Sequence, residues 1–233
     1  ALVLGLVVGG AILQTFVMNN QSIVYQRASI ITQDQGRVAL DMMARFIRMA
    51  GYQENDLSTS SLADGLVGSS AGPSITVRFQ AGGGTMSSQL FDCLGNQISS
   101  GAVSSGAISV NQFRLESDGT GMNNLVCEST HSLDGSKGQG TLSRNIEQLE
   151  ILYGEDTDDD QAPNKYVTVA SADMSKVVAI KICLVIASDN NMLSNNTTFS
   201  DYCLTGTPAV TDKRIRRKVG STITLRNRTG GSA

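Results

Sequence analysis

The composition of the 233-residue chain narrows its class before any motif is considered. A net charge of −3, with only 17% charged residues, provides no overall basic field of the kind that attracts nucleic acid. With a single histidine and no cofactor fingerprint, the chain is predicted to be non-enzymatic. Its 24 glycines and many Ser, Thr and Asn residues are typical of a turn-rich β domain outside the cytoplasm.

The first fifty residues predict one long helix. Residues 1–18 carry no charge, and the first charged side chain is Arg27. From there the sequence is amphipathic and keeps a helical period to about Ala50, before Gly51, a natural helix stop. Such a helix would be roughly 75 Å long, so part of it must lie outside the domain that it belongs to.

We interpret residues 1–22 as a transmembrane or filament-core half of this helix. The apolar run just meets the ~20 residues that a spanning helix needs. Gly5, Gly9 and Gly10 would allow close packing against other helices. A cleaved signal peptide is the alternative, but the start is not basic and the helical pattern continues unbroken, which favours a retained helix.

Residues 23–51 predict an amphipathic half that packs on the rest of the protein. Apolar residues recur at spacings of three, four and seven, while Gln, Asp and Arg fill the opposite face. The predicted stripe contains Val24, Ala28, Ile31, Val38, Met42 and Phe46, with a second row of Leu40, Met43 and Ile47.

Residues 52–233 predict a β-rich globular head. Segments of alternating or continuous apolar residues are separated by Gly-, Ser- and Asp-rich turns, and no strand–helix alternation follows residue 50. The head is therefore predicted to be mainly antiparallel and the whole chain α+β. The predicted strands are 74–80, 107–116, 123–128, 145–154, 166–170, 177–187 and 222–226, with a hairpin turn at 117–121 and a polar loop at 189–200.

The four cysteines predict two disulfides in an oxidising compartment. They are widely spaced and form no CxxC pair, which disfavours a zinc site. Three pairings are open. We favour Cys93–Cys127 with Cys183–Cys203, because nearest neighbours close the shorter loops; four buried free thiols are the alternative.

An acidic loop at residues 155–160 is a candidate calcium site. Asp156, Asp158 and Asp160 alternate, so their carboxylates can converge on one hard cation such as Ca²⁺. Gln161 and Val167 stand where an EF-hand has Gly and Glu, so the loop is not an EF-hand. The alternative is a solvated acidic turn.

A basic run near the C-terminus is a candidate contact patch. It could bind DNA, a lipid head group or an acidic partner. The alternative is the exposed edge of a strand, where charges block unwanted pairing. The run contains Lys213, Arg214, Arg216, Arg217 and Lys218.

Four stretches of the chain together resemble type IV pilins, and specifically the PilW-type minor pilins. Residues 1–17 (ALVLGLVVGGAILQTFV) resemble the helix that follows the pilin cleavage motif, and residues 35–52 resemble the end of that helix. Residues 146–167 are similar to the strand and acidic loop of the family, with Asp159 and Gln161 where the family often has glycine. Residues 216–228 resemble its closing strand.

This resemblance implies a pilin-like fold and a structural role. It implies a minor pilin that helps to prime pilus assembly and joins a complex at the pilus tip, with roles in twitching motility, adhesion and DNA uptake. The implied partners are other minor pilins, the major pilin and a tip adhesin. The implied location is the inner membrane with a periplasmic head, then the extracellular pilus. The alternatives are a type II secretion pseudopilin and a calcium- or DNA-binding tip module.

Overall fold

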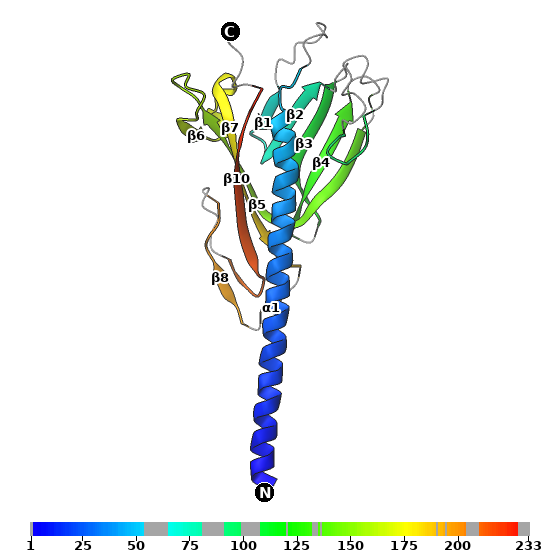
Figure 1. Cartoon of the computed structure of the whole chain (residues 1–233), viewed down its shortest axis with the longest axis vertical. Helices are drawn as coiled ribbons and strands as arrows, with labels where there is room; N and C mark the ends of the chain where they lie inside the picture. Colours follow the sequence, from blue (N-terminus) through cyan, green and yellow to red (C-terminus); the bar gives the residue numbers. More distant parts are fainter. Residues whose placement is uncertain are drawn as a thin grey trace.

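The computed structural model shows a long helix that carries a β head at its C-terminal end (Figure 1). Helix α1 runs over Leu2–Met49, and its N-terminal half projects alone from the head. The predicted α+β class, with one long N-terminal helix and an antiparallel head, is confirmed. The structure describes residues 2–53, 65–80, 91–98, 108–119, 121–131, 135, 137–189, 191–193, 195–203 and 210–227.

The main sheet is antiparallel throughout, in the order β1-β2-β3-β4-β5-β7-β10, with β6 paired to β5. Strands β8 and β9 form a separate two-stranded sheet, and two short 3-10 turns, η2 (Val169–Ser171) and η3 (Met174–Lys176), precede β7. The strands are β1 Leu66–Ser69, β2 Ser74–Gln80, β3 Ile108–Ser117, β4 Asn123–His131, β5 Lys137–Glu155, β6 Lys165–Val167, β7 Val177–Ala187, β8 Thr197–Phe199, β9 Val210–Asp212 and β10 Arg216–Thr224.

The structure agrees with the predicted strands where apolar residues alternate or run on without a break, as in β2 and β7. Strand β5 begins earlier than predicted, because Gly138 and Gly140 continue the ladder with β4 without any apolar signal. The short strands β1, β8 and β9 were not predicted, because each offers only three or four residues of pattern.

The core lies between the second half of α1 and one face of the curled sheet. Met43 and Ile47 are completely buried. The Phe46 ring lies 6.2 Å from that of Phe79 on β2 and 5.9 Å from that of Phe113 on β3, within the range of favourable aromatic pairs. This cluster fixes how far the helix enters the curl of the sheet.

At Gly36, α1 lies very close to β7 and β10. A Cβ atom at this position would lie 2.7 Å from the side chains of both Ile186 and Val219, too close for an unstrained contact. Glycine at this position lowers the helix propensity, but it allows the helix to rest directly on the sheet. The other glycines of the helix, Gly5, Gly9 and Gly10, have no atom within 4 Å of such a Cβ.

The predicted helix stripe is only partly the face that packs on the head. Burial begins at Ala28 and includes Leu40, Met43 and Phe46 as predicted. Val24, Ile31 and Val38 are instead exposed, at 45%, 56% and 54%. Because five residues correspond to about 140° beyond a full turn, Val38 lies well around the helix from Met43 and cannot reach the sheet.

The predicted membrane span of residues 1–22 is not supported. Among the described residues, no helix combines the length and the mean hydropathy that a membrane span requires.

We predict that Gly36→Leu will separate α1 from β7 and β10 and lower the free energy of unfolding by about 3 kcal/mol, because overpacking forces neighbouring groups apart. Chemical denaturation of the full chain measures the change. The matched control is Gly10→Leu, which replaces an exposed glycine of the same helix and should leave the free energy of unfolding unchanged or raise it. Equal effects of the two variants would contradict the close approach at Gly36.

Candidate functional site

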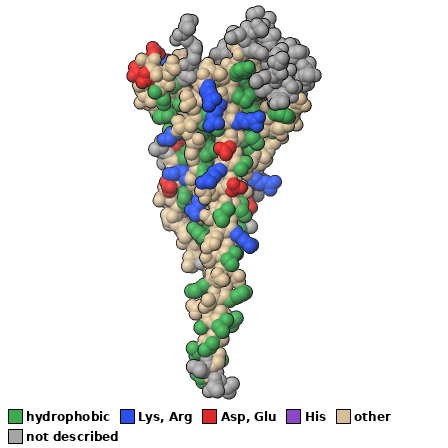
Figure 2. All heavy atoms as spheres, viewed as in Figure 1, with side chains coloured by type: hydrophobic (Ala, Val, Ile, Leu, Met, Phe, Trp, Pro, Cys, Tyr) green, Lys and Arg blue, Asp and Glu red, His purple; other side chains and the backbone are tan. Residues whose placement is uncertain are grey.

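The projecting half of α1, which we call the stem (residues 2–27), is an extended exposed apolar surface. No described side chain of the stem is buried, and Figure 2 shows hydrophobic side chains along its length, with charged side chains gathered higher up. Contiguous exposed apolar surfaces of this kind mark interaction sites. The large exposed side chains include Val3, Leu6, Val7, Val8, Ile12, Leu13, Phe16, Val17 and Met18.

The acidic loop brings its three predicted carboxylates together. One oxygen each of Asp156, Asp158 and Asp160 lie within 4.8 Å of one another. Asp159 and Gln161 have φ angles of 60° and 68°, which lie in the left-handed region that glycine adopts more readily. The calcium prediction stays a prediction, since exposed acidic groups commonly cluster without an ion.

Hydrogen bonds within the loop already engage several of the carboxylate oxygens that a cation would need. The buried Asp156 carboxylate accepts from the backbone N–H of Asp158 (3.2 Å) and of Gln161 (2.7 Å). Asn164 donates to Asp158 (3.0 Å) and accepts from the backbone N–H of Thr157 (2.6 Å). Burial raises the pKa of Asp156, but these N–H donors outweigh it, so the pKa lies below its ordinary value.

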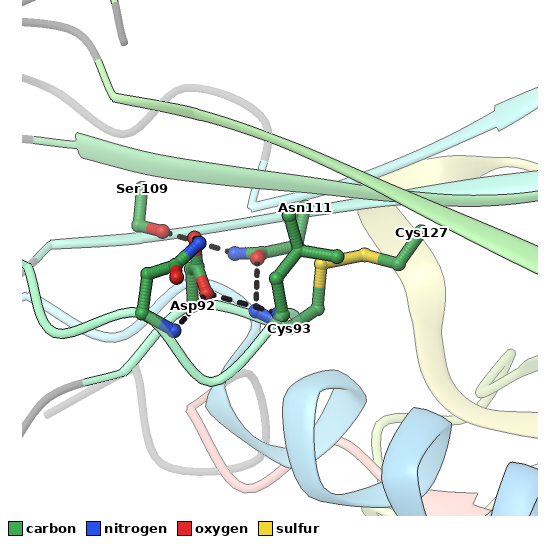
Figure 3. Close-up of a disulfide and its surroundings, with 7 residues drawn as sticks. Asp92, Cys93, Ser109, Asn111 and Cys127 are labelled. Carbon is green, nitrogen blue, oxygen red and sulfur yellow. Dashed lines mark hydrogen bonds between the residues drawn. A yellow bond between two sulfur atoms is a disulfide. The ribbon is translucent and has the colours of Figure 1, made fainter. Parts of the chain in front are cut away.

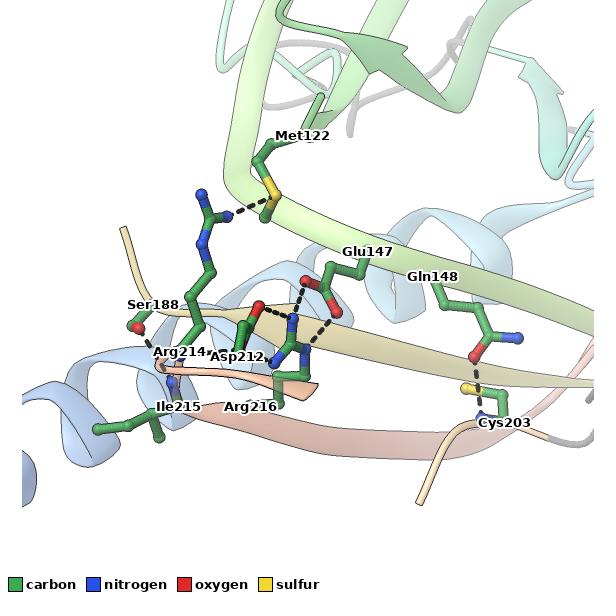
Figure 4. Close-up of polar contacts among 9 residues, drawn as sticks. All are labelled: Met122, Glu147, Gln148, Ser188, Cys203, Asp212, Arg214, Ile215 and Arg216. Carbon is green, nitrogen blue, oxygen red and sulfur yellow. Dashed lines mark hydrogen bonds and ion pairs between the residues drawn. The ribbon is translucent and has the colours of Figure 1, made fainter. Parts of the chain in front are cut away.

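The basic run does not form a single exposed patch. Arg216 is buried, so the prediction that it belongs to a contact patch, or to an exposed strand edge, is wrong. Its guanidinium donates hydrogen bonds to the two carboxylate oxygens of Glu147, at 2.6 and 2.8 Å. It also donates to both carboxylate oxygens of Asp212, each at 2.7 Å (Figure 4). This bidentate pairing with two carboxylates raises the pKa of Arg216 and lowers that of Asp212.

The remaining members of the run point in different directions. Arg217 donates to the Ser29 hydroxyl at 2.6 and 3.1 Å, which ties β10 to α1. Lys218 pairs with Asp201, and Arg214 approaches the Met122 sulfur (Figure 4). Lys213 is exposed. The segment therefore serves mainly to join neighbouring elements of the head.

The first predicted disulfide, Cys93–Cys127, is present and attaches the segment around Cys93 to β4 (Figure 3). Backbone N–H of Cys93 donates to the buried Asn111 side chain on β3 at 3.0 Å, and Asn111 donates to Ser109 at 3.0 Å. Asp92 accepts from the backbone N–H of Leu94 and Asn96, closing the turn. The segment is thus held to the core face of the sheet by covalent and polar contacts.

The second predicted disulfide, Cys183–Cys203, is also present and lies on the opposite face of the sheet. Tyr202 and Cys203 pack on Val185 of β7, and the Tyr202 ring lies edge-on to Phe199 at 5.0 Å. Backbone N–H of Cys203 donates to Gln148 at 3.0 Å. A small second core therefore covers part of this face.

Sequence reasoning missed Glu147, Asp212 and Glu150. Glu147 is far from Arg216 in the sequence, whereas Asp212 is only four residues before it. No local sequence pattern links the three residues. Glu150 lies between the apolar residues Leu149 and Ile151 on β5, and a charge between two apolar residues was the available signal. Its carboxylate is buried without a hydrogen-bond partner among the described residues.

Comparison with known proteins gives a family and a fold. Residues 112–227 match the model of the PilW family, described as Type IV Pilus-assembly protein W. Among solved structures, the chain is similar to the type IV-like pilin TTHA1219 from Thermus thermophilus, with a TM-score of 0.52 and 14% identity. This match covers 84% of the chain and 97% of the other, and at that identity it shows the fold alone. No curated protein matches the sequence.

We predict that Asp156→Ala will lower the melting temperature, because two backbone N–H groups lose their acceptor. A carboxyl group with a lowered folded-state pKa contributes stability that is complete above its ordinary value of 3.8 and is lost as the pH falls through the folded-state value. The melting temperature of the variant should therefore fall less steeply below pH 4 than that of the wild type. Melting curves from pH 7 to pH 2 measure both effects, and parallel acid profiles would refute this role.

We predict that Arg216→Leu will lower the free energy of unfolding by about 3 kcal/mol, because it leaves the Glu147 and Asp212 carboxylates without their shared cation. Denaturant titration at pH 7 measures the loss. Lys213→Leu, a change of the same type at an exposed site of the same segment, should alter the free energy by no more than about 0.5 kcal/mol. A loss of similar size in both variants would show that the buried network is not the cause.

Proposed function

Because the chain is a PilW-type pilin, we propose that it is a non-enzymatic minor pilin that helps to prime type IV pilus assembly. The observation that carries this proposal is the stem, an apolar helix that the protein's own described head leaves uncovered. A subunit of this shape can bury the stem against the helices of other subunits and keep a folded head outside the bundle.

The exposed side chains of the stem are large enough to stabilise such an assembly. Leu6, Leu13 and Phe16 are 79%, 68% and 64% exposed. Burying a side chain of this size contributes about 1.5–3 kcal/mol, so several together favour association strongly. Val24, Ile31 and Val38 extend the apolar surface along α1 to the level of the head, so a neighbouring helix can pack along much of its length.

Gly5, Gly9 and Gly10 suit close contact between helices. Their positions are open, with no atom within 4 Å of a Cβ added at each, so they serve no packing purpose in the single subunit. Small residues on a helix surface let a second backbone approach closely. We assign these glycines to the contact with a neighbouring subunit's helix.

The partners that we propose are other minor pilins and the major pilin, in a complex at the pilus tip that can also hold an adhesin. Twitching motility, adhesion and DNA uptake would then depend on the protein through the pilus. A minor pseudopilin of a type II secretion system would have the same physical form, and only the machine that it serves distinguishes the two.

We predict that Gly9→Leu together with Gly10→Leu will reduce the number of surface pili and the twitching distance, because the added side chains hold neighbouring helices apart. Electron microscopy of the cells counts the pili. The head should remain folded, since neither glycine contacts it. Resistance to protease and the presence of both disulfides test that folding.

The matched control is Gly9→Ala together with Gly10→Ala, which keeps both positions small and should leave the pili near the wild-type number. Normal piliation in the leucine variant would overturn the proposed helix contact. Normal piliation with a loss of protein secretion in the same cells would assign the chain to the type II secretion system instead.

A further inference from the structure

A pocket of about 440 Å³ opens on the outer face of the sheet, the face turned away from α1. Ile186 and Val219 point at Gly36 on the helix, so alternate residues such as Cys183, Gly220 and their partner Glu150 lie on the opposite face. Tyr202 and Cys203 form a wall of the pocket beside strands β5, β7 and β10.

Glu150 is the unusual member of this pocket. Its residue is only 7% exposed, and neither carboxylate oxygen has a hydrogen-bond partner among the described residues. Burying an ionised carboxylate without a partner is costly, so such groups are normally paired with a cation or with hydrogen-bond donors. Glu150 therefore lacks the partner that its position calls for.

The two lysines at the pocket do not supply that partner. Lys218 pairs with Asp201, which balances its charge. Lys181 is exposed, and its ammonium group lies 5.7 Å from the centre of the Tyr166 ring. Its charge is screened by solvent. Among the described residues, therefore, no cation is paired with Glu150, and a bound molecule could supply one.

We propose that this pocket binds a guanidinium group on an alkyl stem, with Glu150 as its counter-charge. A guanidinium is weakly hydrated, pairs with a carboxylate in a bidentate manner and stacks on aromatic rings such as that of Tyr202. Leu152 and the Cys183–Cys203 disulfide provide apolar walls for the alkyl stem.

Neighbouring groups cover the Glu150 oxygens in this structure, so binding requires the side chain to turn toward the pocket. Rotation about its side-chain bonds moves the carboxylate without any change of the backbone. The guanidinium can belong to a free small molecule or to an arginine of a partner protein. This site does not rest on the role in pilus assembly.

The test is a titration of the ¹⁵N-labelled full chain with n-butylguanidinium, followed by NMR at pH 7. We expect saturable shifts of the backbone amides of Leu152, Cys183 and Gly220, which surround the pocket. n-Butylurea has nearly the same shape without the charge and should bind at least tenfold more weakly. Equal binding of the two probes, or shifts that do not saturate, would overturn the proposal.

Glu150→Gln should weaken n-butylguanidinium binding at least tenfold, because it removes the charge and keeps the size. Its melting temperature should be equal to that of the wild type or higher, since a buried unpaired charge is lost. Asp41→Asn removes one exposed charge from α1 and should leave the affinity unchanged. Unchanged affinity in Glu150→Gln would refute the assignment.

A second probe separates the two sources of the guanidinium. The blocked tripeptide acetyl-Gly-Arg-Gly-amide carries the same group on a peptide backbone. If it binds as tightly as n-butylguanidinium and depends on Glu150, the pocket accepts an arginine of a partner protein. If the pocket takes n-butylguanidinium and rejects the tripeptide, its ligand is a free small molecule.

Discussion

The fold depends on how one face of a long helix packs into the curl of an antiparallel sheet. Gly36 allows the backbone of α1 to rest on β7 and β10, and Phe46 reaches between the rings of Phe79 and Phe113. Since only part of the helix surface can enter the sheet, the remaining apolar residues stay outside. The exposure of Ile31 and Val38 is therefore a direct consequence of how the core is built, whereas the stem is exposed because it projects beyond the head.

Within the described part of the chain no helix covers the other face of the sheet, and cross-links stabilise it. The Cys183–Cys203 disulfide, the bond from Cys203 to Gln148 and the pair Lys218–Asp201 hold a polar segment over β7 and β10. In the chain-entropy account, closing a loop of this length stabilises the folded state by about 3 kcal/mol. The same cross-links shape the pocket that contains Glu150, so stability and a binding surface arise together here.

Sequence patterns predicted those features that depend on neighbours along the chain. The helix, strands β2 and β7, the two disulfides and the clustering of Asp156 with Asp158 follow from local periodicity and spacing. Features that depend on distant residues were not predictable in this way. Of the partners of Arg216, Glu147 lies on β5 and Asp212 lies on β9, which was not predicted. The run of basic residues, considered alone, therefore indicated an exposed surface patch.

The sequence pattern also did not show which side of the helix faces solvent. Spacings of three, four and seven identify apolar residues on a broad arc, but they do not say which part of the arc meets the sheet. Val38 and Met43 both belong to that arc, and only the close approach at Gly36 decides between them. A glycine within an amphipathic helix was the signal that could have located the contact.

The alignment of β10 with the helix also bears on mechanical load. In Figure 1, β10 runs beside α1, and its nine residues form a continuous ladder with β7. Arg217 fastens this strand to Ser29 on the helix. A pull along the helix axis is therefore transmitted to the ladder in shear, which loads many hydrogen bonds at once and not one after another. Resistance to forced unfolding is set by the unfolding rate. Because many hydrogen bonds must break together, this arrangement slows the detachment of the head under tension.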